Sequence, residues 1–366
     1  MKNRFAVVTL GAAVLVVGAW FALRPPELPD LPAAVPPAAA AAAPAAVASS
    51  DKLAASAVLA IDPRPNPLRP ARPLQVKATL FNEYLEAKQY RALYDRLRSS
   101  AEGQTAEGRL VLYELLRLCA TVTEGKRSQW KPTIPKREDF VAGIAAADPM
   151  RDRRIAAFDE FTANRCMGFE GVTITQADLD KMLADAAAGG DPRARAMAIE
   201  QEQLIARRTQ GRDNATISDA QIENLKQVLA SKDPEAIRVA GRVLSNSWAD
   251  YALRLGPDQQ PIEPRAFMNA WLVLACEYGQ PCGADTPRLQ QACALQGHCD
   301  AQNFPDYLYY YSSSPHDSQL LVQYRATLRQ ALETGDWSQL SVLRGLPPVA
   351  NRMNFLPGPP FKIPAL

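Results

Sequence analysis

Histidine is scarce in this sequence, and the motifs of several common enzyme families are missing. Only two of the 366 residues are histidine, His298 and His316. Histidine is the usual general base near neutral pH and a frequent metal ligand, so this scarcity restricts both kinds of chemistry. A Gly-rich phosphate loop, a Gly-x-Ser-x-Gly motif and a His-Glu-x-x-His motif are also lacking. The sequence therefore predicts no catalytic residue, no cofactor, no metal site and no enzymatic activity.

One short segment does contain the residue types of a hydrolase triad. Residues 312–317 read Ser-Ser-Ser-Pro-His-Asp. The members of a triad usually come from separate segments, and neighbours in one loop cannot generally reach one another in the required geometry. We interpret the segment as the start of a helix that is capped by Asp317 or Ser318.

A strong charge of either sign is also lacking. The chain has 41 lysines and arginines against 39 acidic residues, which gives a net charge of +2. Nucleic-acid-binding domains normally carry a markedly basic face. The composition therefore predicts that nucleic acid is not a partner.

The N-terminus carries an uncharged apolar run at residues 5–23. A helix of this length spans about 28 Å, close to the thickness of the hydrocarbon core of a bilayer. The positive charges of Lys2 and Arg4 precede this run, and positive charge favours the cytoplasmic side of a membrane span. Residues 1–4 are therefore predicted to stay in the cytoplasm. A cleaved signal peptide is the alternative to a transmembrane anchor. A lipid anchor is excluded, because no cysteine precedes Cys119.

Two proline-rich segments flank the region that should fold. Residues 24–73 contain twelve prolines and many alanines, which favours an extended, disordered linker. Residues 346–366 contain six prolines and are expected to form an extended C-terminal tail. The folded domain is therefore predicted at residues 74–345.

The folded region contains an internal repeat. Residues 173–183 and 216–226 share a pattern of Thr or Ser followed by helix-periodic apolar residues, and each leads to an Asp-Pro pair, Asp191-Pro192 and Asp233-Pro234. Aspartate is a good helix N-cap and proline suits the first helical position. The spacing of about 43 residues predicts α/α hairpins in an all-α, solenoid-like domain. Asp148-Pro149 indicates a third copy.

The segments Gly190-Asp191-Pro192-Arg193-Ala194 and Lys232-Asp233-Pro234-Glu235-Ala236 resemble the Sel1-like and tetratricopeptide-like repeats over residues 130–250. The resemblance implies a scaffold that binds proteins on a concave face. A second pattern resembles uncharacterised membrane-anchored envelope proteins of proteobacteria: Cys276-Glu277-Tyr278-Gly279, then Cys293 to Cys299, then Gly335-Asp336-Trp337. It implies no known activity.

The six cysteines are expected to form disulfides, since an exported chain folds in an oxidising compartment. The spacing from Cys276 to Cys282 is the same as that from Cys293 to Cys299, which favours two local disulfides. By elimination, Cys119 is then expected to pair with Cys166. Cross-pairing between the two adjacent helices is the alternative. A zinc site with His298 is disfavoured by the wide spacing, and redox activity by the absence of Cys-x-x-Cys.

A run of aromatic residues is the candidate partner surface, because tyrosine is favoured at interfaces. Burial in the last hairpin is the alternative. The candidates are Tyr307, Tyr309, Tyr310 and Tyr311.

Together these patterns predict a single-pass inner-membrane protein of a Gram-negative bacterium, with its C-terminal domain in the periplasm. We expect it to be a scaffold for an envelope protein partner in envelope assembly or secretion. The alternative is an envelope enzyme or a cell-wall ligand-binding protein with a site built by the repeats.

Overall fold

The computed structural model describes residues 76, 78–123, 135–211, 214–246 and 251–345. The predicted cytoplasmic end, membrane anchor and linker (1–73) and the predicted tail (346–366) lie outside them. Within the described ranges, no helix has both the length and the apolar character needed to cross a bilayer. The described domain is helix-rich, as predicted, with thirteen α-helices and five short strands among these residues.

Three α-helices open the described domain. They are α1 (Leu80–Glu86), α2 (Tyr90–Arg98) and α3 (Ala106–Cys119). Threonine side chains cap two of them: the hydroxyl of Thr79 accepts a hydrogen bond from the amide of Asn82, and that of Thr105 from the amide of Gly108. Leu97, Leu110 and Leu115 are fully buried between these helices.

Of the three Asp-Pro pairs in the expected repeats, two begin helices as predicted, with the aspartate as the cap. Asp191 accepts hydrogen bonds from the amides of Arg193 and Ala194, at 2.9 and 3.0 Å. Asp233 accepts equivalent bonds from Glu235 and Ala236, both at 3.0 Å. These residues start the second helix of each pair, whereas Thr175 and Ser218 cap the first. The four helices are α6 (Gln176–Ala188), α7 (Pro192–Thr209), α8 (Asp219–Ala230) and α9 (Pro234–Leu244).

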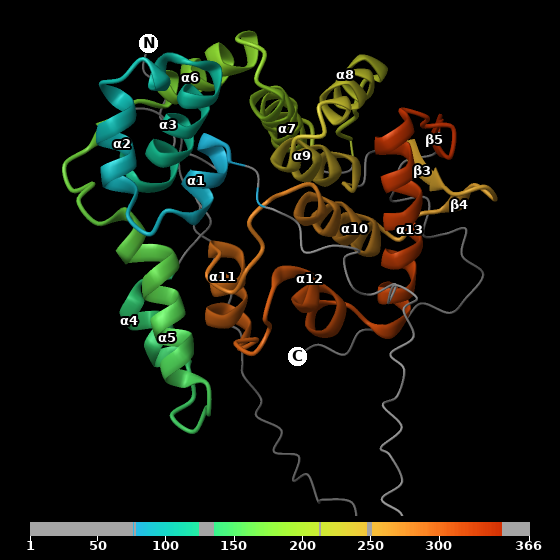
Figure 1. Ribbon diagram of the computed structural model, residues 1–366. Coiled ribbons are helices and arrows are strands. Elements are labelled where there is room, and N and C mark those ends of the chain that lie inside the picture. The colour runs from blue at the N-terminus through green and yellow to red at the C-terminus, as the bar shows by residue number, and fades with distance from the viewer. Residues whose placement is uncertain (1–75, 77, 124–134, 212–213, 247–250, 346–366) are drawn as a thin grey trace, which may run out of the picture. The chain divides into compact units, whose positions relative to one another are not determined.

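Six helices pack side by side in a row (Figure 1). The neighbouring pairs are α3 with α6, α6 with α7, α7 with α9, α9 with α10 (Pro264–Glu277), and α10 with α13 (Pro315–Thr334). Helix α8 covers α7 and α9. Trp271 and Phe267 of α10 are fully buried in the larger hydrophobic core, which reaches from α7 to α13.

The third repeat copy expected at Asp148-Pro149 does not follow the pattern. Helix α4 (Arg137–Gly143) precedes it, and α5 (Arg151–Asp159) begins two residues after Pro149 with no side-chain cap. Asp148 instead accepts a hydrogen bond from the amide of Met150 and pairs with Arg154. The hairpin of α4 and α5 packs through α5 on α11 (Pro287–Gln296), while α3 contacts α6 directly (Figure 1).

Two small sheets were not predicted. One is the parallel pair β1 (Thr121–Val122) and β2 (Thr173–Ile174). In the other, β3 (Tyr251–Leu255) lies between β4 (Gln260–Pro261) and β5 (Leu340–Arg344), with antiparallel pairing on both sides. Leu253 and Leu255 are buried at every second position, which is the period of a strand with one buried face.

The start of α13 differs from the prediction by a few residues. Ser314 is the N-cap, and Pro315 occupies the first helical position. The hydroxyl of Ser314 accepts a hydrogen bond from the amide of Asp317, whose carboxylate accepts one from the amide of Ser314. Asp317 therefore completes a capping box and is not the cap itself. The short helix α12 (Phe304–Asp306) and a π-helical turn at Tyr307–Ser312 precede this cap.

Candidate partner-binding surfaces

Three disulfides join the cysteines in the local arrangement that the spacing favours. Cys276 pairs with Cys282 and Cys293 with Cys299, each across six positions. Cys119 at the end of α3 pairs with Cys166, across 47 positions. The described residues contain no group of three or more histidine, cysteine or acidic side chains placed to hold a metal.

The predicted tyrosine surface is divided by the π-helical turn. Tyr307 and Tyr309 are buried, whereas Tyr310 is 58% exposed and Tyr311 42% exposed. The Tyr307 hydroxyl donates to Gln296 at 2.6 Å, and Arg325 donates to the Tyr309 hydroxyl at 2.7 Å. Tyr307 and Tyr309 therefore belong to the core, and only Tyr310 and Tyr311 remain available to a partner.

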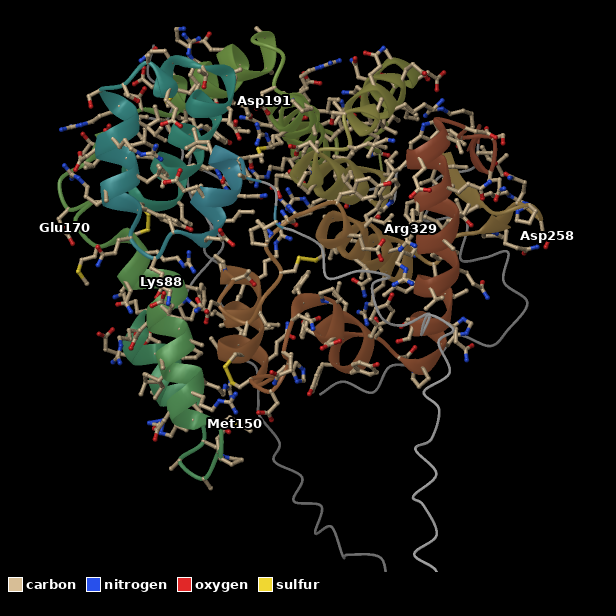
Figure 2. All side chains as sticks on the ribbon, in the orientation of Figure 1. Lys88, Met150, Glu170, Asp191, Asp258 and Arg329 are labelled. Carbon is tan, nitrogen blue, oxygen red and sulfur yellow. A yellow bond between two sulfur atoms is a disulfide. The ribbon has the colours of Figure 1, made fainter. Side chains whose placement is uncertain are left out.

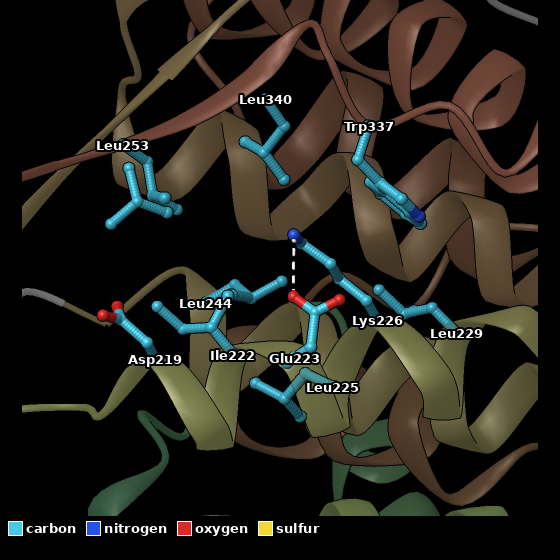
Figure 3. A pocket seen from close by; sticks show the side chains of 11 residues that line it. Asp219, Ile222, Glu223, Leu225, Lys226, Leu229, Leu244, Leu253, Trp337 and Leu340 are labelled. Atoms are coloured by element: carbon cyan, nitrogen blue, oxygen red, sulfur yellow. Dashed lines mark hydrogen bonds and ion pairs between the residues drawn. The ribbon is translucent and has the colours of Figure 1, made fainter.

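An apolar groove lies between α8 and the sheet of β3 and β5. It has a volume of about 300 Å³. Figure 3 shows the side chains of α8 on one side and those of Leu253, Leu340 and Trp337 facing them. Trp337 also stacks on the buried Trp271, at 6.3 Å between ring centroids, so this wall is anchored to the core. The α8 lining includes Ile222, Leu225 and Leu229, and Leu244 and Val342 complete the apolar surface.

Charged residues border this groove. Lys226 pairs with Glu223 at 3.0 Å within α8 (Figure 3). Arg344 of β5 donates to Asp219 at the start of α8, with 3.1 Å from Nε to Oδ1. The groove thus has an apolar floor and a charged rim, which is the anatomy of many protein–protein interfaces.

A cluster of four arginines and three glutamates forms a second feature. Glu114 and Arg117 come from α3, Glu200 from α7, Glu235, Arg238 and Arg242 from α9, and Arg288 from α11. We call this set the arginine cluster.

Each arginine of the cluster is held by a specific glutamate. Arg117 pairs with Glu114 at 2.5 Å, and Arg238 Nε donates to Glu235 at 2.7 Å. Arg242 pairs with Glu200 of the neighbouring helix. Arg288 reaches Glu235 at 3.4 Å, and Gln280 donates to the same carboxylate at 2.6 Å.

The charges of the cluster act on one another. Burial alone raises the pKa of Glu235, but Arg238 and Arg288 outweigh it and lower that pKa to about 2. Burial and the nearby Arg238 lower the pKa of Arg242. Burial and Arg238 also lower the pKa of Arg288, to about 9. The charge on Arg238 therefore disfavours the charged forms of Arg242 and Arg288, whereas Glu114 and Glu235 raise the pKa of Arg117 and Arg238 despite their burial.

The Ser-His-Asp segment does not assemble a triad. Asp317 is committed to the capping box of α13. His316 lines a different cavity of about 710 Å³ between the β3–β4 turn and α13, together with Glu263 and Tyr324. The Tyr324 hydroxyl accepts a hydrogen bond from the amide of Glu263 at 3.1 Å, so it holds the start of α10.

Sequence reasoning did not find the groove or the arginine cluster. The spacing of Glu235, Arg238 and Arg242 places all three on one face of α9, and this pattern could have indicated part of the cluster. The groove offered no such signal, because its far wall comes from β5 and Trp337, more than a hundred residues beyond α8.

Comparisons with protein-family models, with curated proteins and with solved structures give no match for this chain.

Proposed function

We propose that this protein is a membrane-anchored scaffold whose helical domain binds a protein partner in the bacterial periplasm, in envelope assembly or secretion. The observation that carries the proposal is the groove beside α8. Its apolar floor can receive bulky apolar side chains of a partner. The ion pairs Lys226–Glu223 and Asp219–Arg344 form a polar rim around that floor.

The scaffold consists of stacked helical hairpins in this proposal. Helices α6–α7 and α8–α9 are two copies of one Sel1-like or tetratricopeptide-like unit. Support comes from the matched caps Asp191 and Asp233 and from the direct packing of α7 on α9. Stacked repeats characteristically present extended surfaces to other proteins.

The compartment in this proposal is the periplasm. Three disulfides and no free cysteine among the described residues support an oxidising environment. Residues 5–23 anchor the chain in the inner membrane, and residues 24–73 are the spacer that carries the domain away from it.

The test is in vivo cross-linking of the native-level protein, followed by affinity purification and mass spectrometry. We expect a recurrent envelope protein at near-stoichiometric yield. Leu340→Asn places a polar group in the groove wall and should reduce that yield, whereas Leu295→Asn on the exposed part of α11 should not. Recovery of the protein alone, or equal yields from both variants, contradicts the proposal.

A further inference from the structure

The arginine cluster has two layers of opposite charge. The glutamate side chains are the inner layer, with exposures of 8% for Glu114 and Glu200 and 4% for Glu235. The arginine side chains lie further out, with exposures from 13% for Arg238 to 40% for Arg242. Partners outside the cluster therefore meet guanidinium groups first.

The inner carboxylates leave part of this positive charge uncompensated. Four guanidinium groups share three carboxylates, and Glu235 alone serves Arg238 and Arg288. The exposed parts of these guanidinium groups can therefore donate to an additional carboxylate.

From this arrangement we infer that the arginine cluster binds an acidic peptide segment of the protein partner. The guanidinium groups are tethered to three carboxylates, Glu114 on α3, Glu200 on α7 and Glu235 on α9, so they are spread over several helices rather than drawn to one point. A spread array matches several carboxylates along a peptide better than it matches a single small anion. Arginine is also well suited to this role, since its fork of donors pairs with a carboxylate in bidentate fashion.

The inference rests on the proposed function, because it assumes a protein partner, but it concerns a surface other than the groove. A ten-residue oligoglutamate peptide with a fluorescent label is a suitable probe, and a neutral Ser-Gly peptide of the same length is its control. Fluorescence polarisation with the full-length protein in detergent should show binding of the acidic peptide only, weakening as salt is added. Equal binding of both peptides would overturn the inference.

Two variants separate recognition from structural support. Arg242→Gln removes the most exposed arginine of the cluster and should weaken oligoglutamate binding at least fivefold. The matched control is Arg153→Gln, since Arg153 is an exposed arginine that pairs with Asp300 and with no residue of the cluster; we expect less than a twofold change. Equal losses in both variants would contradict the inference.

Glu200→Gln should change the affinity for the acidic peptide in the opposite direction. It removes the carboxylate that competes for Arg242 while keeping the size of the side chain. Binding of the acidic peptide should tighten about threefold, which a loss of folding cannot produce. Unchanged or weaker binding would mean that the cluster is structural only. If oligoglutamate fails to bind while cross-links from the groove still capture a partner, this inference fails and the proposed function stands.

Discussion

At the scale of single residues, Arg193 connects the starts of two helices. Its guanidinium pairs with Asp191 at 2.6 Å and with Glu107 at 2.7 Å, and it lies 3.9 Å from Asp233. It also lies over the ring of Phe81, 5.3 Å from the ring centroid. The caps of α7 and α9 therefore belong to one buried network.

The two caps should contribute unequally to stability. Asp191→Ala removes the cap of α7 and leaves the buried Arg193 without its closest carboxylate, which should cost about 3–5 kcal/mol of unfolding free energy. Asp233→Ala removes only a cap and a more distant charge and should cost about 1 kcal/mol. Urea unfolding of both variants measures the difference; equal costs would refute the assigned role of Arg193.

Glu235 should make the domain sensitive to acid. Its folded-state pKa of about 2 lies below the value of 4.5 that applies to an unperturbed glutamate. The folded state therefore binds this proton less readily than the unfolded state, and the stabilisation is present above pH 4.5 and lost as the pH falls towards 2. We expect a steep decline in unfolding free energy over this range.

The matched variant for this prediction is Glu235→Gln, which cannot titrate. It should be less stable at pH 7, and its stability should change less between pH 4.5 and pH 2 than that of the original chain. If the unfolding free energies of the two proteins fall in parallel with pH, Glu235 is not responsible for the acid sensitivity.

At the scale of elements, the contact of α9 with α10 depends on Gly241. A Cβ atom on this glycine would lie 2.3 Å from the Cβ and Cγ atoms of Trp271, which is fully buried. Gly241→Ala should therefore destabilise the domain by about 3 kcal/mol. Gly143→Ala at the end of α4 meets no atom within 4 Å and should change stability little. Thermal unfolding compares the two, and similar midpoints would contradict this packing.

The disulfides should differ in the stability they provide. In the chain-entropy model, a crosslink over 47 positions contributes about 4 kcal/mol and one over six positions about 2 kcal/mol. Replacing both Cys119 and Cys166 with serine should therefore cost more than replacing Cys293 and Cys299. Denaturant titration under non-reducing conditions tests the ranking, and the reverse order would contradict it.

The predictable elements are those with local signals. Asp191-Pro192 and Asp233-Pro234 fix the starts of α7 and α9, because a cap and a first-turn proline act within four residues. Asp148-Pro149 has the same signature, but its carboxylate is used by Met150 and Arg154, and α5 packs on α11. Strand β5 was missed because its pairing with β3 joins segments about ninety residues apart.

The predicted tyrosine surface is only partly exposed, and the sequence could not show this for the same reason. A run of tyrosines gives no information on which side chains the π-helical turn directs inward, and Tyr307 and Tyr309 proved buried. The groove and the arginine cluster are made by side chains from distant segments, so they become visible only when the helices are packed.

At the scale of the whole molecule, we propose that separate parts of the chain have separate tasks. In the proposed function, residues 5–23 would anchor the domain, residues 24–73 would space it from the membrane, and the disulfides would stabilise it in the periplasm. The groove at α8 and the arginine cluster are two surfaces with different chemistry, one apolar and one cationic. A partner that uses both needs bulky apolar side chains and an acidic segment.

The most direct test of the central claim is site-specific photo-cross-linking in living cells. A photoreactive amino acid replaces Lys226 at the groove, and the control replaces Lys181 on α6, which is also an exposed lysine paired with an acidic residue of its own helix. We expect one discrete cross-linked product with an envelope protein from position 226 and much less from position 181. Equal products from both positions, or none from position 226, would contradict the claim.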